Sequence, residues 1–191
     1  LTTNHSGFWR EPEHFTLLTN TVLREHPSRI RIWSAACATG EEPYTIAMCA
    51  LSSGAQNCAV IASDISATAL RAAREGSYEP SRLTALPPGW RERFFSGGPL
   101  GPRTSISQQV KSMVTFNSLN LLQPFHHLGQ FDVIFCRNVM IYFEQTTRDE
   151  LVSRLAAQLA PNGLLFTGHS ETLLLIPPGL TYVQAATYRK L

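Results

Sequence analysis

Hydrophobic segments that alternate with helical patterns are the feature that most limits what this chain can fold into. Residues 30–33 and 60–64 read as buried strands, since each is a short, mainly apolar run. An apolar helix is expected from Pro43 to about Leu51, and Ser66 can cap a further helix that ends at Gly76. This β-α-β-α order indicates a parallel sheet with helices on its faces.

The sheet pattern resumes in the second half of the chain. Strands are expected over residues 113–116, 131–136 and 164–167, and a long amphipathic helix precedes the last of them and stops at 161–163. Residues 181–190 alternate enough to form an edge strand, which we expect to run antiparallel. The sequence therefore predicts an α/β protein with a mostly parallel, doubly wound sheet and an antiparallel edge strand.

Residues 77–112 interrupt this alternation, because they are rich in proline and glycine. We expect a helix over 88–95 and a small hairpin around 106–110 within them. A helix is also expected over 12–25, before the first strand. Because 191 residues suffice for one sizeable core and are few for two, a single domain over residues 1–191 is predicted.

The net charge of +2 argues against strong electrostatic binding to nucleic acid or to an anionic membrane. The chain has no apolar run long enough to cross a bilayer, and its polar N-terminus does not have the pattern of a signal peptide. Leu1 is not an initiator methionine, so we expect the chain to be a piece of a longer protein.

The cysteines are Cys37, Cys49, Cys58 and Cys136, and none of them lies at CxxC spacing. We interpret them as buried free thiols in a reducing cytoplasm. The sequence also lacks metal-ligand spacings such as HExxH, so no metal site is expected.

A loop of small residues, 34–40, joins the first strand to the next helix, whose N-terminus offers free N–H groups. The loop lacks the GxGxxG pattern of dinucleotide-binding proteins. Glu41 and Glu42 at the helix start would repel a pyrophosphate but suit a cationic ligand such as S-adenosylmethionine, which carries a sulfonium and an ammonium group. Alternatively, the two acids only complement the helix dipole.

Other polar residues are expected at the carboxyl ends of strands, where open α/β sheets bind ligands. Asp64 can accept hydrogen bonds from ribose hydroxyls, although it could instead cap the following helix. Asn120 and Leu121 can bind and sandwich an adenine ring, with a simple turn as the equal alternative.

A third group of polar residues follows the most hydrophobic strand. Arg137, Asn138 and Tyr142 lie where a core position would not select them, which favours a functional role. The segment 169–171 (His-Ser-Glu) could indicate acid–base chemistry, but the sequence places no aspartate partner for it.

Several of these blocks, taken together, resemble the CheR family of chemotaxis receptor methyltransferases. The most specific blocks read WSA…TGEEPY and FCRNVMIYF, and the matches run in order across nearly the whole chain, over residues 33–44, 63–66, 120–122, 131–143 and 168–171. The resemblance implies a Rossmann-like class I methyltransferase fold. It also implies transfer of a methyl group from S-adenosylmethionine to glutamate side chains of chemoreceptors, forming methyl esters and S-adenosylhomocysteine.

The resemblance further implies roles for individual residues. The N-terminal segment would fold over the cofactor, with contacts from Asn4, Ser6 and Arg10. Arg10 and Tyr142 would act as catalytic residues that hold a carboxylate near the reacting centre, and Glu41 or Glu42 would bind the ammonium group of the cofactor. The remaining cofactor contacts would come from Asp64, Asn120, Leu121, Arg137 and Asn138.

The implied partner is the cytoplasmic domain of a chemoreceptor, with the protein acting in the cytoplasm as a monomer, without nucleic acid or membrane insertion. The family usually has a helical domain before the N-terminal segment, and it carries a small β-subdomain that we place at residues 97–115. Two other functions stay open: a signalling module that only binds S-adenosylmethionine, and a methyltransferase for another carboxylate acceptor.

Overall fold

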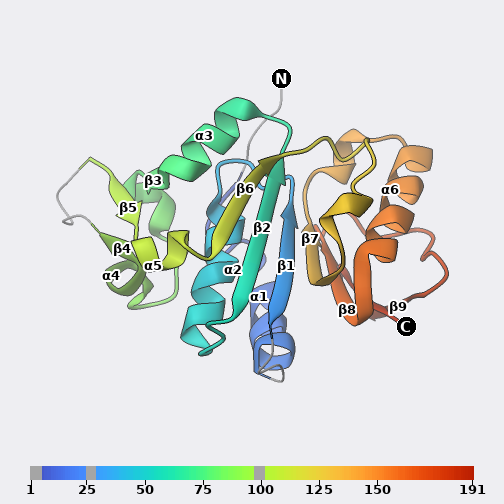
Figure 1. The fold of residues 1–191 in the computed structure, drawn as a ribbon, viewed down its shortest axis with the longest axis horizontal. Helices are drawn as coiled ribbons and strands as arrows, with labels where there is room; N and C mark the ends of the chain where they lie inside the picture. Colours follow the sequence, from blue (N-terminus) through green and yellow to red (C-terminus); the bar gives the residue numbers. More distant parts are fainter. Residues whose placement is uncertain (1–5, 25–28, 97–101) are drawn as a thin grey trace.

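A seven-stranded sheet forms the centre of the computed structural model, which describes residues 6–24, 29–96 and 102–191 (Figure 1). Its strand order is β6-β2-β1-β7-β8-β10-β9. The strands are β1 Ile30–Ala35, β2 Cys58–Asp64, β6 Val114–Ser118, β7 Phe131–Cys136, β8 Leu159–Thr167, β9 Leu180–Gln184 and β10 Thr187–Lys190. The predicted α/β fold with a mostly parallel sheet is therefore confirmed.

Strand β1 lies in the middle of the sheet and pairs in parallel with β2 on one side and with β7 on the other. The chain builds one half through β2 and β6, and then builds the other half from β7 and β8, again by parallel pairing. The strand order thus changes direction between β1 and β7. In open α/β sheets this is the position where ligands bind, outside the carboxyl ends of the strands.

The antiparallel pairing expected near the C-terminus is confirmed, in the form of a hairpin. Strand β10 pairs antiparallel with both β8 and β9, so β9 completes this edge of the sheet. The single strand expected over 181–190 is divided by a turn, and Ala186 in that turn has a φ of 54°.

Helices cover both faces of the sheet, as side-chain alternation along the strands shows. Ile32 and Phe135 pack in one hydrophobic cluster with residues of α1 (Pro12–Leu18) and α2 (Glu41–Ser52). Their chain neighbours Trp33 and Ile134 belong to the cluster that contains α6 (Gln145–Gln158). Successive side chains of a strand point to opposite faces, so α1 and α2 lie opposite α6.

The local signals for α3 (Ala67–Glu75) are correct, whereas the helix expected to stop at 161–163 is α6, which ends at Gln158, because β8 already begins at Leu159. Helix α3 is capped by Ser66, whose hydroxyl accepts the N–H of Ala69 at 3.2 Å, and it ends at Gly76 with a φ of 56°. The helix expected over 12–25 is α1 followed by a π-helical turn, Thr19–Leu23.

The insertion after α3 carries a second sheet of three short strands in the order β3-β5-β4 (Figure 1). Its strands are β3 Ser77–Tyr78, β4 Phe95–Ser96 and β5 Thr104–Ile106, and both pairings are antiparallel. Of these strands only β5 falls within the span 97–115 that we assigned to a β-subdomain. Residues 97–101 lie outside the described part, and Val114 begins β6 of the main sheet.

Short helices complete the insertion, which contains η2 (Pro80–Leu83), α4 (Trp90–Phe94) and α5 (Gln108–Lys111). The hairpin expected around 106–110 is wrong, because the chain turns into α5 after β5. Val110 on α5 is fully buried in the same cluster as α2, and this packing outweighs the local strand-like alternation. Two further single turns, η3 (His126–Leu128) and η4 (Met140–Tyr142), flank β7.

Among the described residues, no helix combines the length and the apolar character that a membrane crossing requires.

Candidate active site

A pocket opens at the carboxyl ends of β1, β2 and β7, where the strand order changes direction. The loops after β1 and β7, the last residue of β2, the start of α2 and the N-terminal segment all contribute to it. Its lining consists of Ser6, Gly7, Arg10, Phe15, Ala36, Cys37, Ala38, Glu42, Asp64, Arg137, Asn138, Val139 and Tyr142. Seven of these residues belong to the set expected from the sequence: Ser6, Arg10, Glu42, Asp64, Arg137, Asn138 and Tyr142.

The loop after β1 forms one wall of the pocket with an unusual backbone. Ala36, Ala38 and Gly40 have φ values of 59°, 48° and 94°, all in the left-handed region that L side chains rarely adopt. Gly40 also packs closely, because an added Cβ would lie 2.9 Å from the Cβ of Ala73 and 3.0 Å from the hydroxyl of Tyr78. The small residues noted in the sequence thus permit a tight turn and expose backbone to the pocket.

Asp64 anchors this loop from the end of β2. Its Oδ2 accepts the N–H of Ala38 at 2.8 Å, and its Oδ1 accepts the N–H of Ser66 at 2.8 Å. The capping role is taken by Ser66 rather than by Asp64. An ionised carboxylate accepts about four hydrogen bonds, so Asp64 keeps acceptor capacity for a ligand in the pocket.

The two glutamates that begin α2 have different surroundings. Glu41 has no exposed surface and is not part of the pocket lining. Its Oε2 accepts hydrogen bonds from the hydroxyls of Ser6 and Thr39, and its Oε1 forms an ion pair with Arg82. Glu41 therefore holds the N-terminal segment and the insertion against the start of α2.

Glu42, in contrast, lines the pocket. Its Oε1 accepts the hydroxyl of Ser34 at 2.7 Å, and its Oε2 lies 3.6 Å from Nε of Arg137. Burial raises the pKa of the Glu42 carboxyl, and the neighbouring guanidinium of Arg137 opposes this effect without cancelling it.

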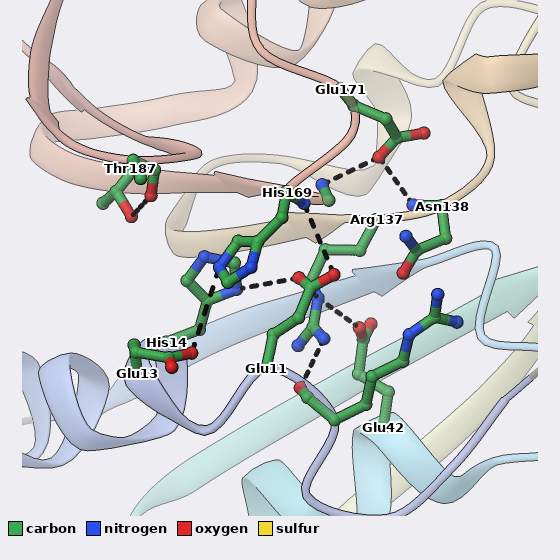
Figure 2. A network of polar contacts seen from close by, with 12 residues as sticks. Glu11, Glu13, His14, Glu42, Arg137, Asn138, His169, Glu171 and Thr187 are labelled. Carbon is green, nitrogen blue, oxygen red and sulfur yellow. Dashed lines mark hydrogen bonds and ion pairs between the residues drawn. The ribbon is translucent and has the colours of Figure 1, made fainter.

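Arg137 connects three parts of the site, as Figure 2 shows. Its Nη2 donates to the backbone carbonyl of Arg10, and its Nε lies 3.3 Å from Oε2 of Glu11. The guanidinium carbon lies 5.4 Å from the ring centroid of Phe15. Arg137 is buried and lines the pocket, and its contacts join the N-terminal segment to β7 and α2.

Arg10 and Tyr142 lie at the exposed side of the pocket. Both line it, from the N-terminal segment and from the turn after β7 respectively. The side chain of Tyr142 remains 58 % exposed, so a large acceptor can reach it from solvent.

Glu171 is a residue whose importance the sequence did not reveal. Its carboxylate is completely buried and accepts four backbone N–H groups from the loops that follow β7 and β8. Oε2 accepts from Asn138 at 2.6 Å and Gly168 at 2.7 Å, and Oε1 accepts from Met140 at 2.7 Å and Ile141 at 3.2 Å. Glu171 thereby holds the loop that carries Arg137, Asn138 and Tyr142 (Figure 2).

Gly168 makes this arrangement possible. A Cβ at this position would lie 2.6 Å from Nδ2 of Asn138 and 2.6 Å from Oε2 of Glu171. The corresponding signal in the sequence is the Gly-His-Ser-Glu run directly after a strand. In the structure the glutamate of this run holds two loops together through backbone hydrogen bonds, and it does not form an acid–base pair.

The remaining expected contacts are not part of this pocket. The side chain of Asn120 accepts the N–H of Leu122 at 2.9 Å, which is the local turn that was the alternative interpretation. Leu121 is buried in the cluster that faces α6. Asn4 lies outside the described residues.

The cysteines are all free and buried, as expected. Cys37 lines the pocket, but burial raises the pKa of its thiol well above the ordinary range. It is therefore an uncharged surface for a ligand rather than a nucleophile.

The fold and the pocket define a Rossmann-like class I methyltransferase domain: an acid-lined ligand site lies at the carboxyl ends of parallel strands, and an antiparallel strand follows β8. The chain belongs to the family described as CheR methyltransferase, SAM binding domain, whose model matches residues 4–188.

Relatives with high identity are chemotaxis protein methyltransferases. The protein of Salmonella typhimurium is 44 % identical over 178 residues, covering 90 % of this chain and 61 % of the relative. The Escherichia coli protein is 45 % identical over 178 residues, covering 90 % and 62 %. The Borreliella burgdorferi protein is 38 % identical over 204 residues, covering 100 % and 71 %. The chain thus spans about three fifths of the first two relatives.

Proposed function

We propose that the protein transfers the methyl group of S-adenosylmethionine to glutamate side chains in the cytoplasmic domain of chemoreceptors, and that it acts as a monomer in the cytoplasm. The observation that carries this proposal is the pocket at the change of strand order. It combines a partly buried acid for a cationic cofactor, Glu42, with an exposed arginine and tyrosine for a carboxylate, Arg10 and Tyr142. The relatives named as chemotaxis protein methyltransferases support the same activity.

The residues of the pocket fit S-adenosylmethionine. We assign Glu42, rather than Glu41, to the ammonium group of the cofactor, because only Glu42 lines the pocket. Asp64 is assigned to the ribose hydroxyls, since its carboxylate has remaining acceptor capacity. Asn138, Val139 and the wall of small residues after β1 complete the enclosure.

The acceptor carboxylate requires little activation. A glutamate is ionised at neutral pH, so it attacks without a general base. When bound, S-adenosylmethionine supplies a methyl group that its sulfonium already activates. The task of Arg10 and Tyr142 is to hold the carboxylate in line with that methyl group and to exclude water, and such alignment accounts for a large part of the rate in comparable reactions.

Radiolabelled methyl transfer to receptor-containing membranes tests the proposal. We expect label that is released by mild base, because glutamate methyl esters are base-labile. Arg10→Ala should remove most of the label, with S-adenosylhomocysteine binding measured by calorimetry in parallel. Base-stable label would identify another acceptor chemistry, and binding without any label would identify a module that only senses the cofactor; either result overturns the proposal.

A further inference from the structure

A cluster of metal-ligating side chains lies beside the pocket but outside its lining. Glu11 directly precedes α1, His14 is in the first turn of α1, and His169 follows β8 (Figure 2). One ligand atom from each of these residues lies within 4.8 Å of the others. The two imidazole centroids are 5.1 Å apart.

Two members of this cluster have buried polar atoms without hydrogen-bond partners. His14 has no exposed surface, and neither of its ring nitrogens has a partner in good hydrogen-bond geometry, although the backbone of Ala185 lies close to the ring. Oε2 of Glu11 is also buried; it is ion-paired with Nε of Arg137 at 3.3 Å, and it lies 3.5 Å from Nδ1 of His14, too far for a good hydrogen bond. Leaving a buried polar group unsatisfied costs about 1–3 kcal/mol, so the ring of His14 has room for a better partner on the side of Glu11.

A divalent metal ion has the chemistry of that partner. Two histidines and one glutamate are a known ligand set for zinc, which binds nitrogen and oxygen at about 2.0–2.2 Å in tetrahedral geometry. Two imidazoles on one tetrahedral ion at that bond length have ring centroids about 5 Å apart, in agreement with the observed separation. Glu13, whose Oε2 is 3.9 Å from Nε2 of His169, or a water molecule can supply the fourth ligand.

The charges around the cluster also permit a cation. Arg137 is the opposing charge, since its Nε lies 3.3 Å from Oε2 of Glu11. The carboxylates of Glu11 and Glu42 pair with Arg137, and Glu13 adds a further carboxylate beside His169.

We propose that Glu11, His14 and His169 form a binding site for Zn²⁺. The ion would join the start of α1 to the loop after β8. That position matters for the pocket, because Arg10 precedes Glu11 and Glu171 follows His169 in the same loop. The proposal rests on the cluster alone and does not depend on which acceptor is methylated.

Zinc titration of the chelator-treated protein tests the site directly. Calorimetry should give one Zn²⁺ per chain, and Co²⁺ should give the visible absorption of a tetrahedral site. His169→Gln is the main variant, because its side chain is 46 % exposed and its replacement leaves the core intact. It should weaken Zn²⁺ binding at least about tenfold, and Zn²⁺ should raise the melting temperature of the parent but not of the variant.

Two further variants complete the experiment. His14→Asn should also lose the Co²⁺ absorption, and its melting curve checks that it folds. His126→Gln combined with His127→Gln removes an adjacent histidine pair elsewhere, at η3, and should bind Zn²⁺ within about twofold of the parent. No binding by the parent, equal binding by His169→Gln, or loss of binding in the control variant would each overturn the proposal.

Discussion

Glu171 accepts a hydrogen bond from the backbone N–H of Asn138 at 2.6 Å, although 33 positions separate the two residues in the chain. Together with the other backbone N–H groups on this carboxylate, the contact joins the loops at the carboxyl ends of β7 and β8. The pocket loop is therefore shaped by a residue that does not line the pocket.

Glu171→Gln should lower both stability and cofactor affinity. A neutral amide has one acceptor oxygen and places an NH₂ group against backbone donors, so buried N–H groups lose their partner. We expect a loss of about 2–4 kcal/mol in the free energy of unfolding, measured by denaturant titration, and weaker S-adenosylhomocysteine binding. Glu150→Gln, at an exposed position on α6, is the matched control and should change neither quantity.

Glu42 should control the pH dependence of cofactor binding. Because burial raises its pKa, the carboxyl becomes protonated at a higher pH than an ordinary glutamate and then loses its attraction for an ammonium group. Affinity for S-adenosylhomocysteine should therefore fall as the pH is lowered from 7 to 5, as measured by calorimetry.

Glu42→Gln provides the comparison for that pH profile. At pH 7 the variant should bind S-adenosylhomocysteine at least about tenfold more weakly, since a charge-assisted contact is lost. Its affinity should also depend less on pH between 7 and 5. An unchanged slope in the variant would assign the pH dependence to another group.

Asp64 and Asn120 should respond differently to replacement by alanine, although both were candidate cofactor contacts. Asp64→Ala removes a pocket acid and should weaken S-adenosylhomocysteine binding at least about tenfold. Asn120→Ala removes a turn contact and should leave binding within about twofold. Calorimetry on both variants, with melting curves to verify folding, tests whether Asn120 contacts the adenine ring of the cofactor.

Tyr142→Phe should separate turnover from cofactor binding. The hydroxyl lies at the exposed side of the pocket, where we place the acceptor carboxylate. Methyl transfer should fall by about 10–100-fold, whereas S-adenosylhomocysteine affinity should stay within about twofold. A parallel loss of cofactor affinity would place the phenol on the cofactor instead.

Gly40→Ala should destabilise the protein more than Gly54→Ala. Both glycines have left-handed backbones, with φ of 94° and 78°, so both variants incur conformational strain. Only at Gly40 does the added methyl group meet neighbours, namely Ala73 and Tyr78. We expect Gly40→Ala to cost about 1–3 kcal/mol more in the free energy of unfolding, measured in urea.

The elements of the main sheet were predictable because their signals are local. The apolar run over 131–136 coincides with β7, and the cap at Ser66 and the stop at Gly76 bound α3 as expected. The insertion was harder to predict. Its strands are only two or three residues long, and α5 forms because Val110 packs against the core.

The chemical types of the pocket residues were also predictable from the sequence. Acids and an arginine that directly follow buried strands are typical of a ligand site. Three questions required the folded protein: which of Glu41 and Glu42 faces the pocket, what Glu171 binds, and where His14 and His169 meet. Side-chain direction at a helix start depends on what packs around it. The contact between His14 and His169, near opposite ends of the chain, forms only when the folded sheet brings these segments together. No local spacing in the sequence predicts it.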